Sequence, residues 1–111
     1  MILVTGSILA KADCVDAALA LSLEHVHRSR QEPGCLAHGV HRDAECPQRL
    51  VFVEQWADQA ALAAHFAVPA SRAFVAAVAA LATEPPHMEV FDATPIRIGG
   101  AAAGRARPQT P

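Results

Sequence analysis

Apolar residues alternate with polar ones, or fill both strand faces, in four short stretches of the chain. Residues 2–10 carry apolar side chains at both even and odd positions, which predicts a strand covered on both sides. Further strands are expected over 35–42, 49–56 and 87–94, and the stretch RLVFVEQW at 49–56 has the strongest β pattern. The chain should therefore build a sheet of four strands.

The segments between these strands have helical spacing. A first helix is predicted from an N-cap at Asp13 to about Arg30, before the Glu-Pro-Gly stop. A short second helix is capped by Asp58 and ends near Ala67, and a third is expected to be capped by Ser71. The expected buried stripes are Val15, Leu19, Ser22/Leu23 and Val26 on the first helix, and Phe74, Val75, Val78 and Leu81 on the third.

The predicted order is β-α-β-β-α(α)-β, which is the ferredoxin-like α+β pattern of an antiparallel sheet with helices on one face. One face of such a sheet lacks a cover, yet the strands are apolar on both sides. We therefore expect a homodimer in which a second copy covers that face. Residues 1–94 form the expected domain, and 95–111 are a C-terminal extension that either reaches the partner subunit or is flexible.

Composition narrows the function classes. The 111 residues suit one domain, and a net charge of -2 argues against binding to nucleic acid. Three cysteines without metal-finger spacing fit free thiols in a reducing cytoplasm. The N-terminal apolar run has no basic segment before it, so we expect neither a signal peptide nor a membrane span. A cytoplasmic protein is predicted.

Three motifs occur in order along residues 1–94. They are Glu32-Pro-Gly-Cys-Leu36, then Glu54-Gln-Trp56, then Ala60-Ala-Leu-Ala-Ala-His65, with Pro69 and Phe74 following. In these motifs the chain resembles the antibiotic biosynthesis monooxygenase family, which includes the small quinol monooxygenases. The resemblance implies a ferredoxin-like dimer, a dimeric α+β barrel, with a pocket between helices and sheet in each subunit.

Members of that family carry out several reactions. Characterised relatives oxidise anthrone- or quinol-like aromatics with O₂ and without metal or flavin, others degrade haem, and one line isomerises a small phosphorylated signalling molecule. By this resemblance we expect an enzyme, a cofactor-independent monooxygenase acting on a phenolic, quinol- or anthrone-like aromatic. Its expected partners are that small substrate, O₂ and a second copy of the chain, with no cofactor, nucleic acid or membrane.

The expected catalytic residues are His65, Trp56 and Glu54. Glu54 and Trp56 share one strand face with Phe52, and a carboxylate on such a face is costly to bury unless it has a partner. His65 borders the apolar stripe of its helix and can act as a base near neutral pH. Alternatives stay open: an exposed or salt-bridged Glu54, a Trp56 that is plain core, and a His65 bonded to a backbone carbonyl.

The expected substrate-binding residues are His38, Phe52, Phe66 and Arg72, and no metal ligands are expected. The pair His25 and His27 lies two apart on a helix, and the pair His38 and His41 lies three apart on a strand. Neither spacing lets both side chains of a pair reach one ion. The chain also has no Tyr, so a mechanism that uses a phenol side chain is ruled out.

Two other functions remain open. The first is haem binding or degradation with His65 as the axial ligand, although few basic residues are present for the propionates. The second is a dimeric small-molecule-binding domain without chemistry. A pocket with polar groups on its walls favours an enzyme, whereas a space filled by side chains favours the binding domain.

Overall fold

The computed structural model describes residues 1–99, and its elements follow the predicted order β-α-β-β-α-α-β. They are β1 (Ile2–Leu9), α1 (Val15–Ser29), β2 (Cys35–Arg42), β3 (Arg49–Trp56), α2 (Gln59–Ala67), α3 (Pro69–Ala79) and β4 (His87–Asp92). The ferredoxin-like fold is confirmed. The last strand ends two residues earlier than expected, and residues 100–111, most of the predicted extension, lie outside the described part.

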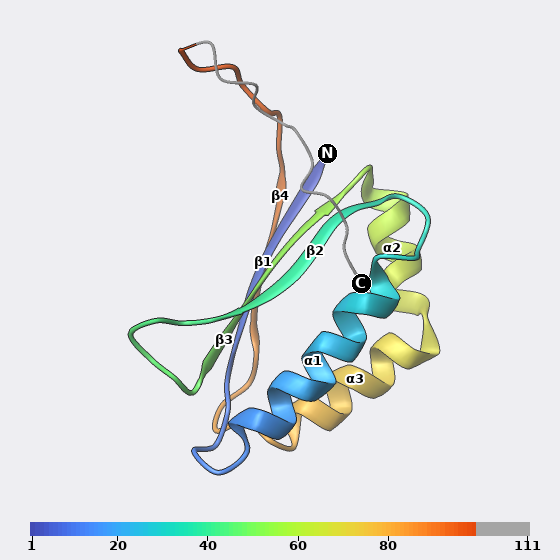
Figure 1. Cartoon of the computed structure of the whole chain (residues 1–111). Helices are drawn as coiled ribbons and strands as arrows, with labels where there is room; N and C mark the ends of the chain where they lie inside the picture. Colours follow the sequence, from blue (N-terminus) through green and yellow to red (C-terminus); the bar gives the residue numbers. More distant parts are fainter. Residues whose placement is uncertain (100–111) are drawn as a thin grey trace.

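The four strands form one antiparallel sheet in the order β2-β3-β1-β4. All three helices lie on the same side of this sheet (Figure 1). The first core cluster lies between α1, α3 and the sheet and includes Ile8, Val26, Leu50 and Val78. A second, smaller cluster packs Trp56 and Leu62 against Ile2 and Val4 at the other end. The two clusters fix the helices over the central strands.

Two helix starts differ from the prediction. Cys14, not Asp13, is the N-cap of α1, and no side chain caps that helix end. Asp13 lies in the preceding turn, where its carboxylate accepts from the Cys14 thiol. Helix α3 begins at Pro69, because proline has no N–H to leave unpaired and its φ is already helical. Ser71 is therefore inside the first turn, with its N–H already bonded to the Val68 carbonyl.

The buried side of α1 includes the predicted Val15, Ser22 and Val26, but it is broader than the predicted stripe and leaves Leu23 out. Leu23 is exposed, while Ala18, Ser22, His25 and Ser29 are buried at spacings of three and four. The serine hydroxyls avoid a desolvation cost because each donates to the carbonyl four residues earlier. Near the end of α1 an imidazole, and not Leu23, is therefore buried.

The sheet face away from the helices stays uncovered in the single chain (Figure 1). The strand register places Leu3, Val51, Val53 and Phe91 on that face, since residues opposite each other in antiparallel strands point the same way. Val53 and Phe91 are 38% and 43% exposed. An apolar face of this kind is where a second copy was expected.

Within residues 1–99, no single helix has the length and hydropathy needed to cross a bilayer. Helices α2 and α3 reach that length only when counted together, and the chain bends by 69° between them.

Candidate functional site

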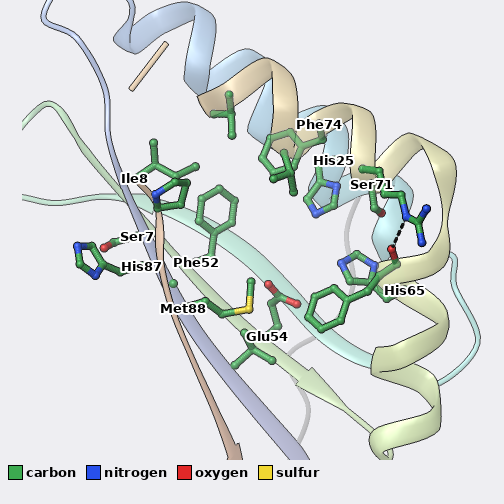
Figure 2. Close-up of a pocket in the computed structure, with 17 residues that line it drawn as sticks. Ser7, Ile8, His25, Phe52, Glu54, His65, Ser71, Phe74, His87 and Met88 are labelled. Carbon is green, nitrogen blue, oxygen red and sulfur yellow. Dashed lines mark hydrogen bonds between the residues drawn. The ribbon is translucent and has the colours of Figure 1, made fainter. Parts of the chain in front are cut away.

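A cavity of about 310 Å³ lies between the central strands and the helices. Its walls are mostly apolar, with Phe52, Phe66, Phe74, Val75, Val78 and Met88 among the lining residues. The polar groups on the walls include His25, Glu54, His65 and Ser71, which Figure 2 labels. Arg72 also lines the cavity. A mostly apolar cavity with a few convergent polar groups is the usual form of a small-molecule site.

Three buried histidines meet beside this cavity. His25 comes from α1, His38 from β2 and His65 from α2. Their ring centroids are 5.2–5.7 Å apart, and one nitrogen from each ring lies within 4.8 Å of the others. His25 and His65 line the cavity, whereas His38 lies outside its lining.

His65 is oriented by a carboxylate. Its Nδ1 lies 2.8 Å from Oε1 of Glu32, which belongs to the turn between α1 and β2. An ionised carboxylate only accepts, so we assign the imidazole proton to Nδ1. The Nε2 lone pair is then left to accept a proton or bind an ion.

Glu54 has two neighbours that favour its charged form. Trp56 Nε1 donates to Glu54 Oε1 at 2.9 Å, and His38 Nε2 lies 3.3 Å from the same oxygen. Burial alone raises the pKa of the Glu54 carboxyl, but the contacts with His38 and Trp56 outweigh burial and hold that pKa below its ordinary value. A negative charge is thus maintained at the cavity wall.

His25 is held in its neutral form. Burial, followed by the repulsion of His38, His65 and Arg28, lowers the pKa of His25 to about 3. Its Nδ1 lies 2.9 Å from an Arg28 guanidinium nitrogen, which can only donate. The Phe74 ring stacks on the imidazole with centroids 4.1 Å apart. Arg28 therefore faces His25.

The close approach of two sequence motifs explains how Glu32 reaches His65. Gly34 has φ +82°, and a Cβ built on it would lie 2.5 Å from Cβ of Ala61 in α2. Only glycine allows both the positive φ and this contact. The Glu-Pro-Gly turn and the Ala-rich helix thus pack directly together, and Glu32 comes beside His65.

The structure places the predicted residues in two groups. Glu54, His65, Phe52, Phe66 and Arg72 line the cavity. Trp56 and His38 do not, and the burial of Trp56 agrees with the alternative that it is core: the residue is 0% exposed and its N–H donates to Glu54. Both residues instead contact Oε1 of Glu54 without lining the cavity themselves.

Three residues at the site were not predicted as such: His25, Glu32 and Ser71. Ser71 Oγ is buried in the cavity wall without a hydrogen-bond partner. The position of His25, seven residues after Ala18 and three after Ser22, was the available signal, since both of those residues face the sheet. Glu32 was noted in the sequence as part of a helix stop and of the first family motif, without a role at the site.

The family model for antibiotic biosynthesis monooxygenase matches residues 1–77. The chain belongs to the antibiotic biosynthesis monooxygenase family. Among solved structures, one described as an antibiotic biosynthesis monooxygenase is 34% identical, with a TM-score of 0.80, and covers 86% of this chain and 100% of its own. The family model and this structure together support the general function type of the antibiotic biosynthesis monooxygenase family for this chain.

Two further relatives are similar to this family member, one in structure and one in sequence. A structure from Deinococcus radiodurans is 26% identical with a TM-score of 0.84, and the match covers 90% of this chain and 100% of that one. An uncharacterized protein of Synechocystis sp. is 32% identical over 81% of this chain. The chain spans 61% of that curated relative's length.

Proposed function

We propose that the protein is a cofactor-independent monooxygenase that oxidises a small phenolic, quinol- or anthrone-like aromatic with O₂ in the 310 Å³ cavity. The observation that carries this proposal is the Glu32–His65 pair at the wall of an aromatic-lined space. A neutral imidazole oriented by a carboxylate is suited to take a proton from a bound phenol or activated CH₂.

Deprotonation is the step that makes such a substrate reactive. O₂ reacts slowly with closed-shell organic molecules, but an anthrone or quinol anion readily gives it one electron. His65 Nε2 takes the first proton, and the resulting radical pair combines to form a carbon–peroxide bond. The imidazolium returns its proton to the distal peroxide oxygen.

The reaction balances without an outside reductant. In an anthrone-type substrate, the second C–H proton leaves, the O–O bond breaks and hydroxide departs with that proton as water. A CH₂ group and one O₂ thus become a carbonyl and one H₂O. All four electrons come from the substrate, and one oxygen atom enters the product.

Other residues at the site have supporting roles in this proposal. Phe52, Phe66 and Phe74 offer flat surfaces for a ring of one to three fused cycles. The unpartnered hydroxyl of Ser71 can donate to a substrate oxygen. Glu54, kept charged by Trp56 and His38, stabilises the imidazolium that forms on His65.

The haem alternative has less support. The cavity volume is near the lower limit for ligand pockets, and Arg72 is the one Lys or Arg among the described lining residues. A tetrapyrrole needs more room and cations for two propionates.

The test is O₂ uptake by metal-stripped protein with a panel of quinols and anthrones. We expect uptake above autoxidation, with one ¹⁸O atom from ¹⁸O₂ in each product molecule. His65→Gln should lower kcat by about 10²–10⁴-fold, the usual contribution of a general base. Glu32→Gln should have a smaller effect, because it disturbs only the orientation of the imidazole.

The matched control is His27→Gln, since His27 is exposed on α1 and should not affect uptake. Uptake that persists unchanged in His65→Gln would remove His65 as the base. Substrate binding without uptake across the panel would favour a non-catalytic binding domain.

A further inference from the structure

We propose that His25, His38 and His65 form a binding site for one divalent transition-metal ion, with the Glu54 carboxylate beside it. Each histidine comes from a different element, and one nitrogen from each lies within 4.8 Å of the others. Imidazole nitrogen is a preferred ligand of Zn²⁺, Co²⁺, Ni²⁺ and Cu²⁺. The inference goes beyond the proposed function and does not depend on it.

The burial and hydrogen bonding of His38 support the metal site independently of the distances within the cluster. Its side chain is completely buried, and neither ring nitrogen has an aligned hydrogen bond. Its Nε2 lies 3.3 Å from Oε1 of Glu54. A buried polar group without a hydrogen bond costs free energy. The folded protein is therefore stabilised if an ion binds the lone pair of the neutral His38 imidazole.

The cluster must contract to hold an ion. Nitrogens at 2.0–2.1 Å from a tetrahedral metal are about 3.4 Å apart, closer than the 4.8 Å limit of the present cluster. The cavity borders two of the three rings, so side-chain rotation has room to close the difference. The same cavity leaves one coordination position open to a small molecule, as in catalytic three-histidine sites.

Glu32 is already placed to orient the His65 imidazole toward an ion. It accepts from Nδ1 of His65 at 2.8 Å and leaves Nε2 for the ion. Carboxylate–histidine–metal arrangements of this kind fix the tautomer and raise the basicity of the ligand. Glu32 and Glu54 together also offset the two positive charges of the ion.

Arg28 opposes binding and gives the proposal a sharp test. Its guanidinium donates to His25 Nδ1 at 2.9 Å, which forces the imidazole proton onto Nε2. Metal ligation through Nε2 requires that proton on Nδ1. Arg28→Gln places an amide oxygen that can accept from Nδ1–H, and it removes a nearby positive charge. This variant should bind the ion severalfold more tightly.

The first measurement is titration of the metal-free full chain with Co²⁺, followed by visible d–d absorption. We expect one Co²⁺ per chain, with the intense bands of a four- or five-coordinate ion, and displacement by Zn²⁺. His38→Gln and His25→Gln should lose the bands. Glu32→Gln should weaken Co²⁺ affinity by about 10–100-fold, the usual effect of removing a carboxylate that orients a ligating histidine.

The chain supplies matched controls on the same elements. His27 is exposed on α1 near His25, and His41 is exposed on β2 near His38. His27→Gln and His41→Gln should bind Co²⁺ as the unaltered protein does. Loss of the bands in these controls, and not in His25→Gln or His38→Gln, would overturn the proposal.

A second measurement avoids substitutions in the core. In ¹⁵N-histidine-labelled protein, Zn²⁺ should shift the imidazole signals of His25, His38 and His65 and leave the other three histidines in place. Signals of the cluster that do not move at one equivalent of Zn²⁺ would overturn the proposal.

Oxygen uptake keeps this inference separate from the proposed function. An ion on His65 Nε2 takes the lone pair that the base needs, so Zn²⁺ should inhibit a cofactor-free reaction. Co²⁺ bands without any oxygenase activity would support the metal site and count against the proposed function. Oxygenase activity without Co²⁺ bands would support the proposed function and count against the metal site.

Discussion

Trp56 Nε1 donates a hydrogen bond to Oε1 of Glu54, two residues earlier on the same strand, at 2.9 Å. Both side chains point to the helix side of β3, and both are buried. The Glu-Gln-Trp stretch is therefore a single unit in which the indole stabilises a charged carboxylate in the core. The indole is too deeply buried to contact a ligand in the cavity.

Trp56→Phe should destabilise the fold by about 2 kcal/mol or more, since a hydrogen bond to a charged group is lost. Denaturant unfolding measures this change. A double-mutant cycle with Glu54→Ala isolates the pair, and we expect a coupling of about 1.5–3 kcal/mol. A coupling near zero would mean that Trp56 acts through packing alone.

Ser71→Ala should leave stability nearly unchanged, within about 0.5 kcal/mol, or raise it, because the buried hydroxyl has no partner to lose. Ser22→Ala is the matched control, since Ser22 Oγ donates to the Ala18 carbonyl at 2.7 Å and its loss should cost about 1 kcal/mol. Both values come from thermal or denaturant unfolding. Equal losses in the two variants would show that Ser71 has a structural hydrogen bond. Under the proposed function, Ser71→Ala should also raise KM.

Gly34→Ala should destabilise the protein by at least about 1–3 kcal/mol, because it strains a positive φ and drives a methyl group into Ala61. Displacement of α2 should also weaken the Glu32–His65 contact. Gly39→Ala on β2 is the control, since its new Cβ meets only the movable end of His41. Denaturant unfolding should give a larger loss of stability for Gly34→Ala than for Gly39→Ala. Similar losses of stability in the two variants would contradict the assigned role of Gly34.

Cys35 should react slowly with iodoacetamide in the folded protein. Burial, with the nearby Glu54 and Glu32 charges, raises the pKa of the Cys35 thiol to about 11. Its ordinary value is 9.0, so the thiolate fraction at pH 8 falls about 100-fold. Alkylation should then keep rising with pH between 9 and 11.

The measurement uses a Cys14→Ser, Cys46→Ser protein, with the same protein in denaturant as the reference. The reference should alkylate with an ordinary thiol profile. A folded-state rate that levels off near pH 9 would show that burial does not protect Cys35.

We propose that a second copy of the chain covers the exposed sheet face. Sedimentation should then give about twice the chain mass of 11.7 kDa. Val53→Glu should produce monomers, because it places a charge in the apolar centre of that face. Leu23→Glu is the control, since Leu23 is similarly exposed, at 41%, but lies on α1. A monomeric unaltered protein would contradict the proposal.

The sequence alone determined the elements and their order. Strand alternation gave the bounds of β2 and β3, and Asp58 was identified as the cap of α2, where its carboxylate accepts from Ala61 N–H. These features depend on residues close together in the chain, so local periodicity and capping chemistry are sufficient to predict them. The three family motifs could also be read directly.

Only the tertiary structure decided which side chains share a site. The sequence argument considered only local pairs of histidines, whereas His25, His38 and His65 come from a helix, a strand and a second helix. Their meeting depends on how α1 is rotated on the sheet and on Gly34 packing against Ala61. No local spacing encodes those two long-range contacts, because both arise from packing between elements.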